Sequence, residues 1–435
     1  MIRQLPMHPA PPAAHDRFVL RDGVPAASPR RLTPPVGFPI KTADLVRALV
    51  MSAREAAEQA EARLAAELGV SGVVLASSGR AGLTLLLQLL REEAPERNEV
   101  VLPAFGCFTL PSAAVRAGLR IRVVDLAPES FELDLQALGP LLGPRTLALV
   151  APHLLGHPLD IPALAQAAES AGAFLIDDAA QALGARRDGQ RAGSGGVGGI
   201  LSFGRGKPLS AMGGGAILIG DSARAARLAR LAATLPPAPE GRRIRQAGLT
   251  AAGSLALIPE LYALAARAPW LRLGITEYDP SFPLARLDSF RSALVGLGLP
   301  RLSAVNAARR RHAALWRQGL AGNSAYPLLS VPVGAEPIEL RLPVLAASAR
   351  DRERALAALR RAGIGASRLY PAPLTAIPAL ARHSPEADRS FPQATALAER
   401  LLCLPTYPYL DSARIAAGVT ILAELGKRAI AERGR

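Results

Sequence analysis

Seven short apolar runs, separated by stretches with helical spacing, constrain the fold of this chain more than any other feature. Each run is rich in Val, Ile and Leu, a composition typical of strands that are buried on both faces of a sheet. The pattern therefore predicts an α/β fold, a three-layer α/β/α domain with a mostly parallel seven-stranded sheet. The runs occupy residues 73–77, 99–104, 121–126, 147–154, 174–180, 199–203 and 215–220.

The chain divides into an arm and two domains. With 435 residues it is long enough to bury the cores of two domains. Residues 1–41 are rich in Pro and without periodicity, so we expect an extended arm there. Residues 42–300 form the large domain, which begins with a helical pattern over 42–68, and 301–435 form a smaller α/β domain with its own helices and short strands.

Composition limits the partners and the compartment. The net charge of +15 suits an anionic partner, but the arginines are scattered and aromatic residues make up only 4%. We therefore expect no nucleic-acid partner. Two cysteines, Cys107 and Cys403, make no disulfide framework, and no secretory signal begins the chain, so we expect a cytoplasmic protein with Cys403 in the core.

An apolar segment at 247–274 interrupts the large domain. Its uncharged part, 247–259, is shorter than the roughly 20 residues that span a bilayer. We expect a core helix pair or an interfacial segment, and we consider peripheral membrane contact through it.

Lys207 lies in the stretch SFGRGKPLSAMGGG, directly after the run at 199–203. Only 3 of the 51 basic residues are Lys, so a Lys at this position suggests chemistry that Arg cannot perform. Its amine can lose a proton and attack a carbonyl carbon. Flanking glycines allow the backbone to approach a ligand closely, although a solvated surface Lys is the alternative.

Two further groups of polar residues follow other strands. Asp177 and Asp178 end the run at 174–180, where Asp178 is either a helix N-cap or the acid that pairs with a pyridinium nitrogen. Ser77, Ser78 and Gly79 open the helix after the first run, either as an N-cap or as a phosphate cradle. Because parallel strands carry their ligands at their carboxyl ends, we expect these residues to meet Lys207.

These motifs and their order resemble the DegT/StrS family of pyridoxal-phosphate-dependent sugar aminotransferases, of the aspartate-aminotransferase fold group. The resemblance covers roughly residues 45–430. It is carried by long stretches that include VVLPAFGCFTLPSAAVRAGLRIRVVDL, IDDAAQALGA, SFGRGKPLSAMGGG, NAARRR and LCLPTYP.

The resemblance implies a cofactor and a role for each candidate residue. Lys207 would form the internal aldimine with pyridoxal 5′-phosphate, and Asp178 would pair with the pyridine nitrogen. Gln181 would lie near the phenolic oxygen of the ring. The phosphate would be held by Ser77, Ser78, Gly79 and Ser202, together with Arg286 from the partner subunit of a homodimer.

Several positions depart from the family pattern or keep two interpretations. Cys107 stands where an aromatic residue usually stacks on the cofactor ring, so Phe105 or Phe108 is expected to take that role. Tyr370 is assigned either to substrate contact or to core packing. His153 and His157 have no metal-like partners in the sequence, so we predict no metal site, and we expect them to pack in loops, with substrate contact as the alternative.

The resemblance implies a transaminase that moves an amino group, with L-glutamate as the donor, onto a keto-sugar linked to a nucleotide, for polysaccharide or glycoconjugate biosynthesis. Two alternatives are kept. One is a pyridoxal-phosphate enzyme that acts on a non-nucleotide ketone. The other is a non-catalytic, membrane-associated scaffold of the same fold.

Overall fold

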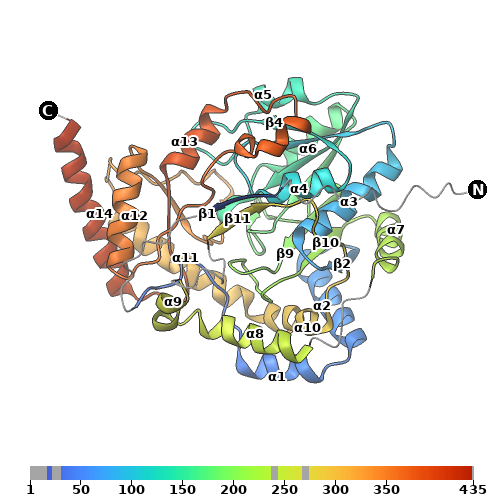
Figure 1. The fold of residues 1–435 in the computed structure, drawn as a ribbon, viewed down its shortest axis with the longest axis horizontal. Helices are drawn as coiled ribbons and strands as arrows, with labels where there is room; N and C mark the ends of the chain where they lie inside the picture. Colours follow the sequence, from blue (N-terminus) through green and yellow to red (C-terminus); the bar gives the residue numbers. More distant parts are fainter. Residues whose placement is uncertain (1–16, 22–30, 237–242, 267–273, 434–435) are drawn as a thin grey trace, which may run out of the picture.

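A computed structural model of the chain describes residues 17–21, 31–236, 243–266 and 274–433. The seven apolar runs form one sheet, in the order β2-β10-β9-β6-β5-β3-β4 (Figure 1). Six strands share one direction and β10 alone runs against them, so the predicted mostly parallel seven-stranded sheet is confirmed. In chain order the strands are β2 (Gly72–Ala76), β3 (Glu99–Pro103), β4 (Arg120–Val124), β5 (Thr146–Pro152), β6 (Phe174–Asp178), β9 (Gly198–Ser202) and β10 (Gly215–Ile219).

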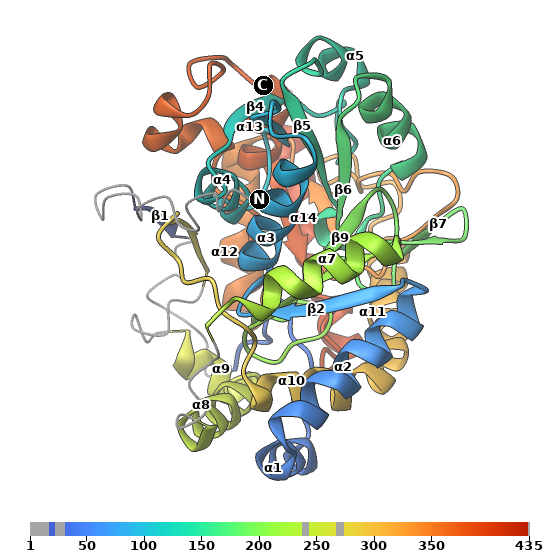
Figure 2. The same ribbon diagram turned by 90° about the vertical axis from the view of Figure 1, so that its right-hand side faces the viewer.

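Helices cover both faces of this sheet, which makes the three predicted layers. Figure 2 shows α6 on the other side of the sheet from α3 and α4. Nine of the fifteen residues of α3 are buried, mostly leucines, because this helix lies between the sheet and its helical neighbours α4 and α7. The covering helices are α2 (Ala53–Leu68), α3 (Gly79–Glu93), α4 (Thr109–Arg116), α5 (Leu135–Leu138), α6 (Ile161–Ser170), α7 (Ser222–Ala233) and α10 (Ser289–Gly298).

The helical pattern over residues 42–68 is broken in the structure. It forms two helices, α1 (Thr42–Val50) and α2, instead of one. The break is fixed by Ser52, whose hydroxyl accepts a hydrogen bond from the Glu55 N–H at 3.2 Å as the N-cap of α2. A good N-cap residue within a helical pattern thus starts a new helix.

The C-terminal part forms a smaller unit with its own core. Its strands β13 and β14 pair antiparallel, and α12 and α14 pack together beside them. Trp316 is fully buried in this core, where its indole N–H donates to the Pro405 carbonyl at 3.0 Å. The elements are α11 (Leu302–Gly319), β13 (Leu342–Leu345), α12 (Ala349–Arg361), α13 (Pro392–Arg400), β14 (Leu401–Leu404) and α14 (Ser412–Arg433). A small three-stranded sheet joins β7 (Arg186–Arg187), β8 (Gln190–Arg191) and β12 (Ala335–Glu336).

Parts of the N-terminal arm have a fixed structure that its composition did not predict. Residues Phe18–Arg21 form β1, which pairs antiparallel with β11 (Ile275–Tyr278). The Leu32 N–H donates to the Pro259 carbonyl at 3.0 Å, and the Thr33 N–H donates to the Gly363 carbonyl at 2.9 Å. This stretch therefore connects the large and the small domain. Residues 1–16 and 22–30 lie outside the described residues.

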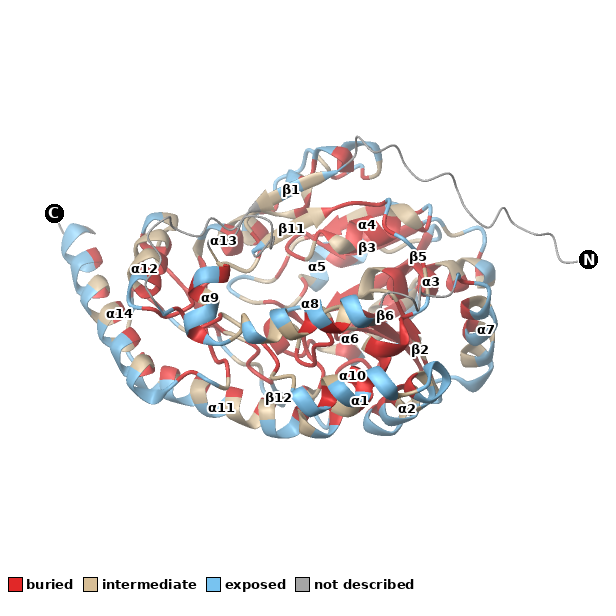
Figure 3. Ribbon diagram, turned by 60° about the horizontal axis from the view of Figure 1, so that its bottom comes forward, coloured by how far each residue is buried: buried red, intermediate tan, exposed pale blue. Residues whose placement is uncertain are grey.

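The apolar segment forms two short helices, α8 (Arg243–Leu255) and α9 (Pro259–Ala265). Within the described residues no single helix is long and apolar enough to cross a membrane. Helices α8 and α9 are long and apolar enough only when they are taken together, and the pair is bent by 111°. Figure 3 shows α8 at the surface next to α1, with much of its length exposed. Residues 267–273 of the segment lie outside the described residues.

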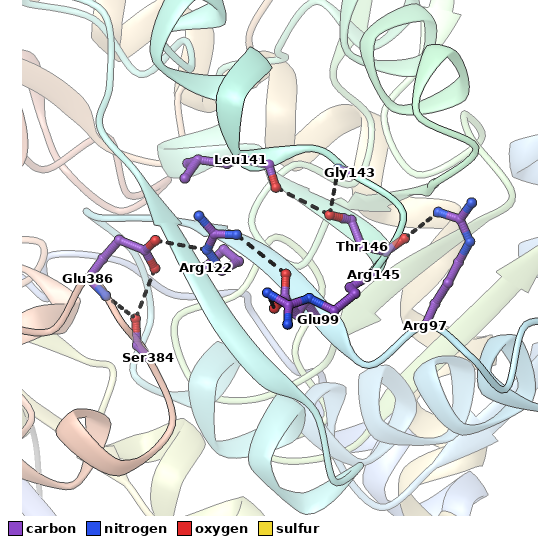
Figure 4. Close-up of polar contacts among 9 residues, drawn as sticks. All are labelled: Arg97, Glu99, Arg122, Leu141, Gly143, Arg145, Thr146, Ser384 and Glu386. Carbon is purple, nitrogen blue, oxygen red and sulfur yellow. Dashed lines mark hydrogen bonds and ion pairs between the residues drawn. The ribbon is translucent and has the colours of Figure 1, made fainter.

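The edge of the sheet at the amino ends of its parallel strands carries a network of paired charges (Figure 4). Glu99 accepts from Arg145 at 3.1 Å and from Arg122 at 3.4 Å, and Arg122 also binds Glu386 at 2.8 Å. The side chains of Glu99 and Glu386 are almost fully buried. The network ties the segment that carries Glu386 to β3 and β4.

Candidate active site

Three of the predicted site elements meet at one edge of the sheet. β2 ends at Ala76, β6 ends at Asp178 and β9 ends at Ser202. Because these strands share a direction, their last residues lie at the same edge. β10 runs the other way, so the loop from Ser202 to Gly215, which contains Lys207, returns along this edge.

The start of α3 and the end of β9, where the sequence predicts a phosphate cradle, lie close together. The Ser78 hydroxyl accepts a hydrogen bond from the Ala81 N–H at 3.2 Å, as an N-cap does. A Cβ atom on Gly79 would lie 3.1 Å from the Cβ of Ser202, so only Gly leaves this corner open. The structure thus places Ser202 against the positive end of the α3 dipole, an arrangement that favours an anion.

Ser77 and Arg286 lie side by side at the edge of this cradle. Ser77 donates its backbone N–H to Ala285 at 2.9 Å, and Ala76 forms a bridge with Arg286. The Arg286 side chain is exposed, and its Nε donates to the Ala232 carbonyl at 3.4 Å. The structure contains one chain, so the contribution of Arg286 to a partner subunit stays a prediction.

The loop that carries Lys207 is closed by its own backbone. The Phe203 carbonyl accepts from Ala211 and Gly213, and the Phe203 N–H donates to Gly214. Lys207 itself is half-buried. Within the described residues it forms no ion pair with a carboxylate, which leaves its amine available for a ligand.

Arg309 of α11 binds the loop that carries Lys207, a contact that the sequence did not predict. Its guanidinium is fully buried and donates to the carbonyls of Pro208 at 3.2 Å and Gly37 at 2.8 Å. It also donates to the Asn306 side chain at 2.6 Å. Burial lowers the pKa of Arg309 to about 9. Among the described residues, its hydrogen-bond acceptors are all neutral. No local pattern distinguishes Arg309 from its neighbours in the run of arginines.

Asp178 is a buried carboxylate without a fixed cationic partner. Its Oδ1 accepts a hydrogen bond from the Ala180 N–H at 3.0 Å, so it caps the turn that follows β6. Burial raises the pKa of Asp178, and the nearby charge of Lys207 offsets part of this effect. Asp178 forms no ion pair within the part of the chain that the structure describes. A cation bound here would stabilise its ionised form.

Asp177 and the two histidines have structural roles. Asp177 Oδ2 accepts from the backbone N–H groups of Gly193 and Gly195, and Oδ1 lies 2.6 Å from His153 Nε2. Because His153 Nδ1 accepts from the Leu159 N–H, the proton of the neutral ring lies on Nε2 and is donated to Asp177. His157 lies 3.4 Å from Glu339. No group of three metal-ligating side chains occurs among the described residues.

Gln181 and Tyr370 meet although 189 residues separate them. Gln181 Nε2 donates to the Tyr370 hydroxyl at 2.7 Å, and both side chains are buried. Phe105 contacts Tyr370 edge-on, with ring centroids 5.5 Å apart, whereas Phe108 packs against Phe18. Of the two aromatic candidates, Phe105 is therefore the one that contacts another candidate site residue.

Comparison with known proteins agrees with this geometry. The sequence model of the DegT/DnrJ/EryC1/StrS aminotransferase family matches residues 45–422. The chain belongs to this family. The predicted resemblance is thereby confirmed, and the protein is a pyridoxal-phosphate-dependent transaminase.

Individual relatives of this aminotransferase are nucleotide-sugar enzymes by name. One is the UDP-N-acetyl-3-dehydro-alpha-D-glucosamine 3-aminotransferase of Acidithiobacillus ferrooxidans, 29% identical over 83% of this chain and 86% of the relative. Another is the dTDP-3-amino-3,4,6-trideoxy-alpha-D-glucose transaminase of Streptomyces venezuelae, 28% identical over 85% of this chain and 86% of the relative. The crystal structure of S. venezuelae DesV, in complex with a ketimine intermediate, superposes with a TM-score of 0.71 at 26% identity. It covers 91% of this chain and 100% of DesV.

The residues at this edge fit the cofactor of the aminotransferase family. The Gly79–Ser202 corner at the start of α3 has no Cβ atom at Gly79 in the way, and it offers the backbone N–H groups and hydroxyls that a phosphate needs. The buried carboxylate of Asp178 lacks an ion pair that a protonated ring nitrogen would supply. Lys207 offers the amine, and Gln181 offers an amide between these elements.

Proposed function

We propose that this transaminase moves an amino group from L-glutamate onto a keto-sugar that is linked to a nucleoside diphosphate. The observation that carries the proposal is the meeting of Lys207, Asp178 and the Gly79–Ser202 corner at one sheet edge. The names of the relatives support a nucleotide-sugar acceptor. Such a product would serve polysaccharide or glycoconjugate biosynthesis.

Each residue of the site has a task in this reaction. When bound, pyridoxal phosphate supplies an electron-poor ring that takes up the electron pair released at the substrate carbon. The Lys207 amine holds the cofactor and then moves the proton at that carbon, acting as tether and as base. Asp178 keeps the ring nitrogen protonated. Ser202 and the start of α3 hold the phosphate.

The test follows the bound cofactor by its visible absorbance. Purified protein saturated with pyridoxal phosphate should show a visible band that L-glutamate bleaches, and addition of the correct keto-sugar nucleotide should restore it. A set of keto-sugar nucleotides, with non-nucleotide ketones for comparison, would identify the acceptor by product mass. Restoration by a non-nucleotide ketone alone would overturn the nucleotide-sugar assignment, and a protein without a visible band would favour a non-catalytic scaffold.

We further propose a homodimer in which Arg286 of one subunit completes the phosphate site of the other. The exposed side chain of Arg286, at the rim of the cradle, is open to contact with a second subunit, which supports this proposal. Mixing Lys207→Ala and Arg286→Ala chains distinguishes the two possible origins of the arginine. A contribution in trans restores about a quarter of the activity, because half of the randomly mixed dimers hold one intact site. A contribution within one subunit restores none.

We also propose that the enzyme is cytoplasmic and that it touches an anionic membrane surface through α8, α9 and the adjacent α1. Of the fifteen exposed large apolar residues in the described part of the chain, nine lie there: Val46, Leu49, Val50, Ile244, Leu249, Leu255, Ile258, Leu261 and Leu264. Helix α8 contains no acidic residue, and exposed Lys41, Arg47 and Arg245 accompany the apolar side chains. A second copy of this basic face would meet like charge, whereas anionic lipid would meet opposite charge.

Flotation with liposomes tests the membrane contact. Vesicles with anionic lipid should carry the protein upward, and neutral vesicles should carry less of it. Replacing Leu249 and Leu264, which are 63% and 66% exposed, with Gln should abolish flotation without changing the fold. If the double variant instead becomes monomeric and unsubstituted protein does not float, this face is the subunit interface and the membrane proposal fails.

A further inference from the structure

The amide of Gln181 is held at both of its ends. Its Oε1 accepts a hydrogen bond from the Leu155 N–H at 3.2 Å, and its Nε2 donates to the Tyr370 hydroxyl at 2.7 Å. A backbone N–H can only donate, so the oxygen of the amide must face Leu155 and the nitrogen must face Tyr370. One N–H of the amide group remains for another acceptor.

Tyr370 is in turn fixed by its surroundings. It is buried, Phe105 packs edge-on against its ring, and the thiol of Cys107 lies near its hydroxyl. Cys107 also accepts a hydrogen bond from the Thr109 hydroxyl at 3.0 Å. Because the Tyr370 oxygen accepts from Gln181, its own proton is free to be donated to Cys107. The phenol therefore links Gln181 to the position where the family usually has a stacking aromatic.

The segment that carries Tyr370 is anchored in both domains. At one end Ser367 pairs with Cys403 of β14, with hydrogen bonds of 3.0 and 2.8 Å. At the other end the Leu374 N–H donates to the Ala104 carbonyl, just after β3, at 2.7 Å. Tyr370 thus reaches the large-domain site from a segment that the small domain holds.

We infer that Tyr370 is a positioning residue that fixes the orientation of the Gln181 amide, so that its remaining N–H is presented to the phenolic oxygen of the cofactor. The inference rests on the proposed function, because it needs the cofactor ring to lie beside Gln181. Without the phenol hydroxyl, Gln181 Nε2 loses its partner and the amide is free to rotate. The small domain thereby acts on the cofactor through a single side chain.

The expected consequence is a shift in the titration of the bound cofactor. A hydrogen bond donated to the phenolic oxygen favours its charged form, and the visible band titrates with the proton that this oxygen shares with the Lys207 amine. In Tyr370→Phe the pH midpoint of the band should rise by about half to one unit, the size expected for one lost hydrogen bond. Cys107, Asp178 and Arg341, the titratable or charged groups that act on Tyr370, remain in place.

The matched control removes a phenol hydroxyl at another buried tyrosine. Tyr326 is buried in the small domain, and its hydroxyl donates to the Asp351 carbonyl at 3.3 Å. Tyr326→Phe should leave the midpoint unchanged. In a Gln181→Ala background, Tyr370→Phe should add no further shift in the midpoint. Both substitutions remove the same interaction, the N–H of Gln181 that is presented to the phenolic oxygen.

The result that overturns the inference is an equal midpoint in Tyr370→Phe and unsubstituted protein, or a full additional shift in the Gln181→Ala background. Urea unfolding of the cofactor-free variants tests the link without the cofactor, since additive losses of stability would show that Gln181 and Tyr370 do not act together. A protein that shows no visible band with pyridoxal phosphate, but non-additive unfolding, would overturn the proposed function and leave the contact itself intact.

Discussion

The two edges of the central sheet differ in whether their buried charged side chains form ion pairs. At the amino ends of the parallel strands, Glu99 and Glu386 are buried but paired with arginines at 2.8 to 3.4 Å. At the carboxyl ends, Asp178 is buried, and neither it nor Lys207 forms an ion pair within the described residues. The first edge satisfies its charges by contacts within the chain. At the second edge Asp177 is bonded to His153 and to backbone N–H groups, but Asp178 and Lys207 stay available.

This difference distinguishes charged side chains that stabilise the fold from charged side chains that are available to a ligand. A buried carboxylate without a cation costs free energy, and proteins usually remove that cost by pairing or by protonation. On the proposed function, the cofactor offsets the cost at Asp178, because its protonated ring nitrogen supplies the missing partner. Substitutions at the active-site edge should therefore impair chemistry more than stability, and substitutions at the other edge should do the reverse.

The largest expected effect is that of Lys207→Arg. Arg remains protonated and makes no ordinary Schiff base, so the variant should lack the visible band and show no measurable transamination. Absorbance spectra and turnover with L-glutamate measure both. The same substitution at exposed Lys427 of α14 is the control and should change neither. An undiminished band in Lys207→Arg would contradict the assignment of this residue.

The next effect is that of Asp178→Asn, which should separate activity from stability. Loss of one preorganised electrostatic partner should lower turnover by about 10²- to 10³-fold. The cofactor-free variant should nevertheless be more stable at neutral pH, because it no longer buries a carboxylate charge. Turnover and urea unfolding measure the two effects, and a variant that loses stability along with activity would show that Asp178 serves the fold.

The stability gain of Asp178→Asn should depend on pH. Burial raises the pKa of Asp178 in the folded protein, so the folded state holds this proton more tightly than the unfolded state does. The destabilisation is fully present above the raised pKa and is relieved as the pH falls through it. The difference between variant and unsubstituted protein in urea should therefore shrink on acidification, and a difference that is constant with pH would contradict this cause.

At the opposite edge, Glu386→Gln should reduce stability and leave chemistry unchanged. The substitution removes the carboxylate that accepts from Arg122 at 2.8 Å and that bonds to Ser384. The loss should be about 1–3 kcal/mol, the range for a hydrogen bond to a charged group. Urea unfolding measures it, with turnover at saturating cofactor as the second readout. A fall in turnover without a fall in stability would show that the two edges are coupled.

The sequence predicted the sheet and the edge at which the site lies, for local reasons. Apolar runs, the glycines around Lys207 and the polar residues after strands are patterns of near neighbours. The contacts that it missed join distant positions. Arg309 binds the carbonyl of Pro208, 101 residues away, and Tyr370 binds Gln181, 189 residues away. Such contacts depend on how the small domain packs on the sheet. The local periodicity of apolar residues in the sequence carries no information about that packing.

The smallest expected effect distinguishes the two interpretations of Ser78. As the N-cap of α3, its hydroxyl contributes about 1 kcal/mol of stability, which Ser78→Ala removes and Ser78→Gly removes only in part. Ser52→Ala, at the N-cap of α2 and with the same 3.2 Å hydrogen bond, should cost a similar free energy of unfolding without changing cofactor affinity.

If the Ser78 hydroxyl also binds the phosphate, both Ser78 variants should weaken cofactor binding alike, by about tenfold, because both lack the hydroxyl. Equilibrium titration with pyridoxal phosphate measures this. An affinity that falls only in the Ala variant would mean that the helix start, and not the hydroxyl, holds the phosphate, so the cradle at this edge would be built from backbone alone.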